Sequence, residues 1–492
     1  MNCTSQAYCI SSFNINRMES AKHHYDRVET EEVNDDRSKR LRIHGTTLQS
    51  RRLQDTNQYR ETGDCYDEVM KGYILHVNGS VRSSWLNHVQ WHTREEMIPS
   101  DIEEIESEQD CYDHIGITTQ IQIRTQMHQL NEIKRKLWPA AEHCGLLDSH
   151  DAYFHFEQAR RACNPLEILG EGRQGGLNTL FMNRSAIKLA NLNAMLGFSL
   201  TRHNKKETFV FVDLCGAPGG FSEYILQHCR QPSCRGYGMS LIGHNEHGRG
   251  VNWRIGTTNN YQTCHGADGT GDIYNWNNVL ALQSMVQRDC VDPSFPNPSI
   301  EDGKVHLVMA DGGFDAQRDS EHQEELAQKI CVCQASAALA LLKSGGTFVM
   351  KMFGFQTTAV RTLIRNIWQN FDHMIVVKPI SSRPASAERY VVFSGFKGTN
   401  ASFDGSKWRD HTFLGDTGRG ICSDDEAKQS RYLNIYLDAI DLDMITLNLK
   451  TCIAILSHLQ RRVRNIEHDD YENETKAPRI DIDSYAREWY LH

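Results

Sequence analysis

A buried strand, a glycine-rich turn and a helix follow one another in residues 209–229, FVFVDLCGAPGGFSEYILQHC. The apolar run at 209–214 predicts a strand covered on both faces, and 221–229 has helical spacing. Gly216, Gly219 and Gly220 carry no Cβ, so the backbone can approach a ligand beyond the strand's carboxyl end. The turn alone is equally compatible with a strand–helix connection that binds nothing. It lacks the GxGxxG of dinucleotide sites and the Lys-Ser/Thr of P-loops.

Short β-rich runs alternate with helical ones from this stretch to about residue 398. The strands are expected at 305–310, 346–353, 373–379 and 389–396, and the helices at 323–342 and 359–371. This alternation predicts an α/β, Rossmann-like fold with a mostly parallel sheet and helices on both faces. The last two strands lie too close for a helical crossover, so we expect an antiparallel pair at the sheet edge.

The rest of the chain divides by composition. Residues 1–115 are polar and mixed in charge, which predicts a largely disordered region. Its basic cluster, RSKRLR at 37–42, is either a nuclear localisation signal or a solvated charge run. Residues 116–180 are expected to be a helical part of the catalytic module and 181–400 the catalytic domain. Residues 401–492 are expected to be a helical extension, in which the apolar stripe of 432–463 should dock on that domain.

Composition limits the classes of protein. The 492 residues carry a formal net charge of −10, which excludes a uniformly basic coat for nucleic acid but leaves room for a local basic cleft. No apolar run approaches the roughly 18 residues of a membrane helix, and no secretory signal is visible. The 15 cysteines include no CxxC pair, which favours reduced thiols. Cys229, Cys234, Cys264 and His265 match no common tetrahedral zinc spacing, so no metal is expected.

Charged residues stand at places where a sheet edge would gather them. Asp311 follows one apolar strand, and Lys351 lies inside another, where an unpaired charge costs several kcal/mol. Lys351 could instead snorkel to water. Lys188 lies on a helix that begins near Asn183, and alone it indicates only a solvated face. The loop KPISSRPASAER at 378–389 is, alone, an ordinary edge loop.

Taken in order, the motifs DLCGAPGGFSEYIL, LVMADGGFD, GGTFVMKMF and KPISSRPASAERYVV resemble those of the FtsJ/RrmJ-type ribose 2′-O-methyltransferases. With NPLEI (164–168) and FMNRSAIKLAN (181–191), they look most like the eukaryotic cap-specific mRNA 2′-O-methyltransferases. The resemblance runs from about Arg160 to Lys397. It implies an enzyme that methylates the first transcribed nucleotide of m7G-capped mRNA with S-adenosyl-L-methionine, forming cap 1. The nucleus is the implied location, and the capped 5′ end and the transcription or capping machinery are the implied partners, without DNA or membrane.

The resemblance also assigns site residues. Its catalytic tetrad falls on Lys188, Asp311, Lys351 and Glu388. Its cofactor contacts fall on Asn183, Cys215, Gly216, Ala217, Pro218, Gly219, Gly220, Phe221, Asp272 and Ile273, and its substrate contacts on Arg160, Arg383 and Glu388.

The chemistry explains these residue types. A ribose 2′-OH is a poor nucleophile until a base accepts its proton, and Lys351 can be that base only if its pKa falls. Burial and the neighbouring cation Lys188 should lower this pKa, while Asp311 should orient Lys351 and oppose the shift. Glu388 should position either Lys188 or the ribose.

Three departures and three alternatives accompany this prediction. The basic residue expected shortly before Asp148 is missing, the segment GEGRQGG (170–176) is inserted, and no G-patch, guanylyltransferase-like or WW module is expected. The alternatives are methylation of the second cap nucleotide, methylation of another RNA such as ribosomal RNA, and a catalytically inactive RNA-binding scaffold.

Overall fold

The structure is a computed structural model that describes part of the chain. The described residues are 92–93, 105–148, 150–164, 181–201, 207–229, 234–243, 252–290, 303–313, 322–398, 403–413 and 424–467. Most of the N-terminal region predicted to be disordered, its basic cluster and the GEGRQGG insertion lie outside them. Within 1–115 the prediction was wrong for 92–93, which form a strand, and for 105–115, which begin a long helix. Among the described helices, none has the length and apolar character needed to cross a membrane.

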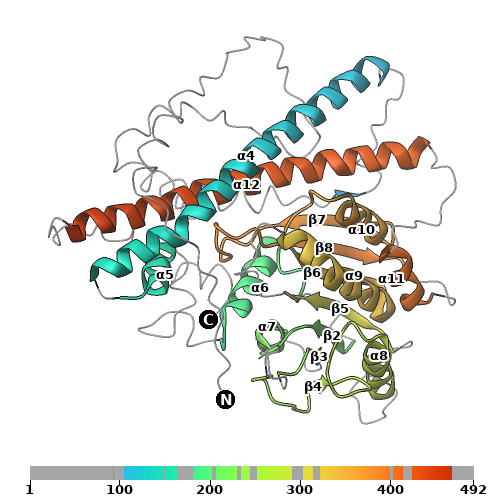
Figure 1. The fold of residues 1–492 in the computed structure, drawn as a ribbon. Helices are drawn as coiled ribbons and strands as arrows, with labels where there is room; N and C mark the ends of the chain where they lie inside the picture. The colour runs from blue at the N-terminus through green and yellow to red at the C-terminus, as the bar shows by residue number, and fades with distance from the viewer. Residues whose placement is uncertain are drawn as a thin grey trace, which may run out of the picture. The chain divides into compact units, whose positions relative to one another are not determined.

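The core of the fold is an eight-stranded sheet in the order β1-β7-β8-β6-β5-β2-β3-β4 (Figure 1). The strands are β1 (His92–Thr93), β2 (Phe209–Leu214), β3 (Cys234–Met239), β4 (Tyr261–Cys264), β5 (Val305–Ala310), β6 (Leu342–Met352), β7 (Phe371–Val377) and β8 (Arg389–Phe396). The strands from β4 to β6 pair in parallel, which confirms the mostly parallel sheet. β7 and β8 form the expected antiparallel pair, but β8 lies between β6 and β7, and the short β1 forms the outermost antiparallel strand.

Helices cover both faces, as predicted. They are α6 (Arg184–Met195), α7 (Gly220–His228), α8 (Trp276–Cys290), α9 (Gln323–Leu341), α10 (Thr358–Trp368) and α11 (Gly405–Phe413). Side chains alternate along β2, so Val210 and Val212 join one apolar cluster with α8, α9 and α10, which we call the α9-side core. Phe209 and Phe211 face the other way and pack with α6 and α7 in the α6-side core.

Two long helices, α4 (Ile105–Asp148) and α12 (Asp424–Glu467), pack against each other, together with α5 (Ala152–Ala162) (Figure 1). Ile123, Leu130, Ile455 and Leu459 are among the side chains of a third cluster, the α4–α12 core. α12 also places Leu433 and Leu437 in the α9-side core. The extension is therefore helical and docks on the sheet domain, as its apolar stripe predicted.

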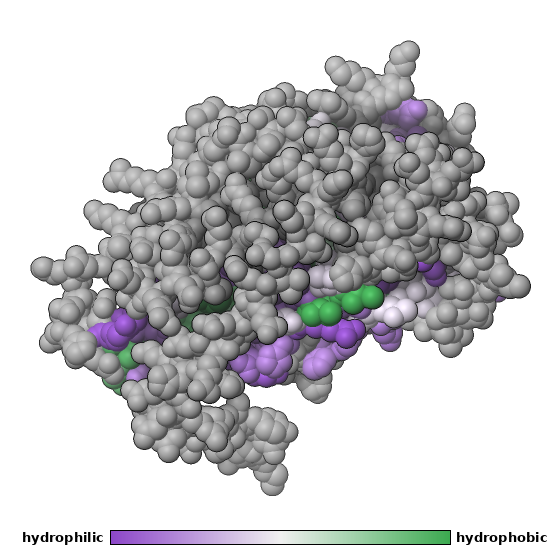
Figure 2. Space-filling view, turned by 90° about the horizontal axis from the view of Figure 1, so that it is seen from above, coloured by the Kyte–Doolittle hydropathy of each residue, from purple (hydrophilic) through white to green (hydrophobic). Residues whose placement is uncertain are grey.

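The surface differs from this interior. In the view from above, the described residues that can be seen form a narrow band and a few small areas, in which hydrophilic residues surround a few hydrophobic ones (Figure 2). α4 itself leaves Ile117 and Ile121 exposed. α4 therefore buries one apolar face in the α4–α12 core and leaves other apolar side chains at the surface.

Candidate active site

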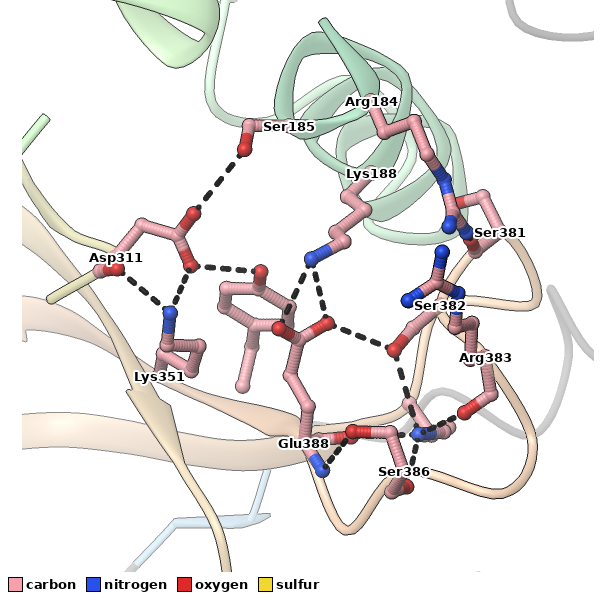
Figure 3. Close-up of polar contacts among 12 residues, drawn as sticks. Arg184, Ser185, Lys188, Asp311, Lys351, Ser381, Ser382, Arg383, Ser386 and Glu388 are labelled. Atoms are coloured by element: carbon pink, nitrogen blue, oxygen red, sulfur yellow. Dashed lines mark hydrogen bonds and ion pairs between the residues drawn. The ribbon is translucent and has the colours of Figure 1, made fainter. Parts of the chain in front are cut away.

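The carboxyl edge of the parallel strands gathers the four predicted catalytic residues (Figure 3). Asp311 directly follows β5, and Lys351 is the penultimate residue of β6. Glu388 immediately precedes β8, and Lys188 lies on the second turn of α6. Parallel neighbours β5 and β6 end at the same edge, so the topology itself brings these distant sequence positions together.

Lys351 and Asp311 form one ion pair. Lys351 Nζ lies 3.1 Å from Asp311 Oδ1 and donates to the Asp311 backbone oxygen at 2.7 Å. Tyr390 donates its hydroxyl to Asp311 Oδ1 at 2.9 Å, and Ser185 donates to Oδ2 at 3.4 Å. The Lys351 side chain is 10% exposed, so its ammonium does not extend into water as a snorkelling lysine would.

Lys188 and Glu388 form the other ion pair. Lys188 Nζ lies 2.8 Å from Glu388 Oε1 and 2.9 Å from Oε2. Ser382 donates its hydroxyl to Oε1 at 2.7 Å. Glu388 is thus paired with Lys188, one of the two partners expected for it.

The pKa values follow this pairing. Burial lowers the pKa of Lys351, but the carboxylates of Asp311 and Glu388 outweigh it, so the pKa lies above its ordinary value. The net lowering expected from burial and Lys188 is therefore not found. Burial raises the pKa of Glu388, but Lys188, Lys351 and Lys378 together bring it well below its usual range. Lys351 is therefore an ammonium and Glu388 a carboxylate in the free protein.

Lys378 organises the loop that presents Glu388. Its Nζ lies within hydrogen-bond distance of three backbone oxygens, those of Arg383 (3.0 Å), Ser386 (2.7 Å) and Glu388 (2.8 Å), and of the Ser382 hydroxyl (3.3 Å). Burial lowers the pKa of Lys378 to about 7, with Glu388 opposing this shift. The ordinary edge loop of the sequence is thus closed around the half-buried Lys378 side chain.

The glycine-rich turn lies beside these groups. Cys215 has a φ of 57° and Gly219 one of 112°, both in the left-handed region. A Cβ on Gly220 would lie 2.0 Å from Asn183 Oδ1, so the turn packs directly on the start of α6. Asn183 caps that helix, accepting from the backbone nitrogens of Ser185 at 3.0 Å and Ala186 at 3.4 Å. Non-glycine residues with positive φ are uncommon and cluster at functional sites.

Asp272 and Ile273 lie beyond the end of β4. Ile273 is buried in the α9-side core, against which Cys215 also packs. Asp272 is half-buried, and its Oδ1 accepts from the Tyr274 backbone nitrogen at 2.9 Å. The predicted cofactor residues therefore follow β2 and β4, two strands of the same parallel sheet.

Comparison with known proteins agrees with this geometry. The family model described as FtsJ-like methyltransferase matches residues 181–396.

The chain contains an FtsJ-like methyltransferase domain. The chain is similar to cap-specific mRNA (nucleoside-2′-O-)-methyltransferase 1 of Drosophila melanogaster, at 31% identity over 244 residues, or 48% of this chain and 28% of that protein. Proteins of the same name from Danio rerio and Homo sapiens are each 32% identical, over 50% and 49% of this chain and 29% and 28% of theirs. The chain spans less than a third of the length of these relatives.

The residues of the FtsJ-like domain suit an S-adenosyl-L-methionine cofactor. Asp272 offers carboxylate oxygens of the kind that bind ribose hydroxyls, and apolar Ile273 lies beside it. The Phe221 ring is buried, and its centre lies 6.1 Å from that of the Tyr390 ring. Burial raises the pKa of Cys215 to about 12, so its thiol stays neutral beside the turn.

The two predicted RNA-contacting arginines differ in position. Arg383 lies in the loop before β8, and Figure 3 shows it in the cluster with Arg184 and Ser381. Arg160 lies on α5, outside the FtsJ-like domain, where it pairs with Glu157 and its guanidinium lies 5.7 Å from the Phe156 ring. α5 and Ala385 of the loop share the α4–α12 core, which connects the helix that carries Arg160 to the active-site loop.

Several residues of the site were not predicted. Tyr390, Ser185 and Ser382 complete the hydrogen bonds of the tetrad. Lys378 was expected only as a basic residue of an RNA-binding cleft, whereas it binds the Glu388 backbone oxygen. Tyr390 pairs with Lys351 across β8 and β6, a register that the sequence of either strand does not reveal. In the described part of the chain, no group of three or more His, Cys, Asp or Glu side chains could hold a metal ion.

Proposed function

We propose that the chain transfers the methyl group of S-adenosyl-L-methionine to the ribose 2′-OH of the first transcribed nucleotide of m7G-capped mRNA, forming cap 1. The observation that carries this proposal is the pair of ion pairs, Lys351–Asp311 and Lys188–Glu388, beside the glycine-rich turn. Relatives named for this activity support it. The proposed substrate is made in the nucleus, so the proposal includes nuclear localisation and contact with the transcription or capping machinery.

The cofactor supplies an electrophilic methyl group on a cationic sulfur. We assign its binding to the turn from Cys215 to Phe221, to Asn183, and to Asp272 and Ile273. Much of the rate enhancement should come from aligning the ribose oxygen with that methyl group.

Lys351 is the proposed proton acceptor. Its Nζ, in the neutral amine form, would take the proton of the 2′-OH as the new oxygen–carbon bond forms and the methyl carbon–sulfur bond breaks, leaving a neutral thioether. Asp311 holds Nζ in position, and Tyr390 in turn binds Asp311. The raised pKa of Lys351 means that this amine form is scarce in the free protein at neutral pH. Activity should therefore depend steeply on pH.

Lys188 and Glu388 are assigned to the ribose. Glu388 fixes the Lys188 ammonium, which then stabilises negative charge developing on the 2′-oxygen. Arg383 and Arg160 are assigned to the RNA and its cap. Such contacts position the RNA and make its binding dependent on salt.

A methyl-transfer assay tests the proposal. Short RNAs with m7GpppN, GpppN or triphosphate ends would be incubated with labelled S-adenosyl-L-methionine and the wild type, Lys351→Met or Lys343→Met. Lys343 is a matched control, since it lies on the same strand and pairs with Glu207 at 3.0 Å near the strand's other end. We expect label on the first-nucleotide ribose of m7GpppN-RNA, lost in Lys351→Met and retained in Lys343→Met.

The other outcomes are equally informative. Label on the second nucleotide, or label that does not require a cap, would overturn the cap 1 assignment and retain the 2′-O-methyltransferase chemistry. Retained binding of cofactor and RNA without any label would indicate a scaffold.

A further inference from the structure

The helix α12 lies outside the FtsJ-like domain but reaches the strand ends that carry the tetrad. Arg389, the first residue of β8, directly follows Glu388, and it lies opposite Met352 in the sheet. Met352 in turn directly follows Lys351. A group that fixes Arg389 and the chain just after β6 therefore holds both a base and a carboxylate of the proposed site.

Asp441 of α12 is such a group. Its Oδ1 accepts from a terminal nitrogen of Arg389, and its Oδ2 accepts from the Phe355 backbone nitrogen at 3.2 Å and from the Gln356 side-chain amide. The side chains of Arg389 and Asp441 are 3% and 1% exposed. A single buried carboxylate thus joins the start of β8 to the segment that leaves β6.

Arg389 itself binds residues near both strand ends. Its Nε donates to the Ala387 backbone oxygen at 3.2 Å, and another nitrogen donates to the Phe353 oxygen at 3.4 Å. Its guanidinium also lies 5.0 Å from the centre of the Phe355 ring. The residues on both sides of Glu388 are therefore bound through one guanidinium held by α12.

Asn448 continues the same face of α12. It lies seven residues after Asp441, a spacing of two helical turns. With its amide nitrogen turned to the loop, Asn448 donates to the backbone oxygens of Ser386 at 3.1 Å and Pro384 at 2.6 Å. Asp441 and Asn448 thus contact the chain after and before Glu388.

Docking of α12 does not require this ion pair. Leu433 and Leu437 already anchor the helix in the α9-side core. A buried ion pair loses solvation and often stabilises a fold no more than apolar residues would. The Arg389–Asp441 ion pair lies against the start of β8 and the chain just after β6. This location indicates that the pair fixes the positions of the residues at these two strand ends.

We propose that Asp441 is a positioning residue of the active site and that Asn448 assists it, so that α12 sets the placement of Glu388 and Lys351. The inference rests on the proposed 2′-O-methyltransferase function and deepens it. Asp441 contacts neither substrate nor cofactor in this assignment and acts only through Arg389 and the segment after β6.

Asp438 provides a matched control. It lies three residues earlier on α12, is also buried, and pairs with Arg361 of α10. It accepts from Gln120 of α4 at 2.6 Å and, within the described residues, contacts no residue of the loop before β8. Its partner Arg361 donates to the Phe355 backbone oxygen at 2.6 Å, so the two variants share the segment after β6 and differ at the loop before β8. Asp438→Asn and Asp441→Asn remove the same charge from the same helix.

The experiment compares full-length wild type, Asp441→Asn, Asn448→Ala and Asp438→Asn. Each would be assayed for kcat and KM on m7GpppN-RNA, at a temperature well below every unfolding midpoint. We expect Asp441→Asn to lower kcat about tenfold or more, since a misplacement of about 1 Å can cost about a hundredfold. Asn448→Ala should also lower kcat. This variant removes a neutral side chain, so it leaves no buried charge without a partner. KM for the cofactor should change little, and Asp438→Asn should retain kcat within about twofold.

Hydrogen exchange of residues 384–392 provides a readout that does not depend on turnover. Exchange should be faster in Asp441→Asn and Asn448→Ala than in Asp438→Asn. Equal kcat and equal exchange in the three variants would overturn the positioning role while leaving the methyltransferase proposal intact. A wild type without methyl transfer would instead count against the proposed function, and the exchange comparison would still decide whether α12 orders the loop. If Asp441→Asn does not fold, Asn448→Ala decides alone.

Discussion

Lys351 holds its proton through two carboxylates. Burial lowers the pKa of this lysine, but Asp311 and Glu388 raise it by more. A base with a raised pKa gains its amine form only as pH rises, by about tenfold for each pH unit below that pKa. We therefore expect kcat/KM to climb with pH through the neutral range. Asp311→Asn removes a charge that raises the pKa, so its rising limb should shift to lower pH, although its maximal rate should be smaller.

Ser185→Ala is the control for this pH profile. It removes the 3.4 Å hydrogen bond to Asp311 Oδ2 but no charge, so the limb should stay at the wild-type pH. An Asp311→Asn profile with the limb unshifted would show that another group controls the pH dependence.

The four tetrad positions were predictable because each lies in its own ordered motif. Their immediate partners were not. Tyr390 stands in the apolar run RYVVFSGF, where an aromatic residue indicates only a strand core, and its hydroxyl meets Asp311 solely through the β6–β8 register. Lys378 stands next to a proline in a polar loop, which indicates an exposed cation, whereas folding surrounds it with backbone oxygens. These contacts depend on how close distant segments come in the folded chain, which the order of residues in the sequence does not show.

At the scale of elements, α6 links the glycine-rich turn to the proposed catalytic residues. Asn183 begins the helix, and Lys188 lies on its second turn. Asn183→Ala removes the side-chain cap and should lower the free energy of unfolding by about 1 kcal/mol. Asn183→Asp keeps a capping oxygen and should be close to wild type, because the two residues cap about equally well. Urea unfolding of the cofactor-free protein, with an unchanged m-value, measures both. Equal losses in the two variants would mean that the amide nitrogen, rather than the cap, stabilises this site.

Other elements were less visible in the sequence. β3 (CRGYGM) and β4 (YQTC) are short and lack a clear alternation, so neither was predicted. Their strand conformation depends on pairing within the sheet, since β3 pairs in parallel with β2, and β4 with β3. The helix α8 was overlooked although Val279, Leu282 and Val286 have helical spacing and are buried. The sequence signal for that helix was present.

At the scale of the whole molecule, α12 contributes to two apolar cores. Leu437 is buried in the α9-side core with the sheet, and Leu459 is buried in the α4–α12 core. A continuous helix that shares side chains with both should couple their unfolding. The apolar stripe of 432–463 predicted that the extension docks, but not that it serves both clusters, because a stripe does not identify its partners.

This coupling predicts one cooperative transition. Leu437→Ala and Leu459→Ala should each reduce stability by about 2–5 kcal/mol, the usual cost of such a truncation in a packed core. Both should move the same thermal transition, with far-UV circular dichroism and tryptophan fluorescence changing together. Ile121→Ala, at an exposed position of α4, is the control and should leave the midpoint almost unchanged. If Leu459→Ala creates an earlier, separate transition while the sheet domain melts as before, α4 and α12 unfold independently. The loop before β8 would then lose its support from α12 without loss of the sheet.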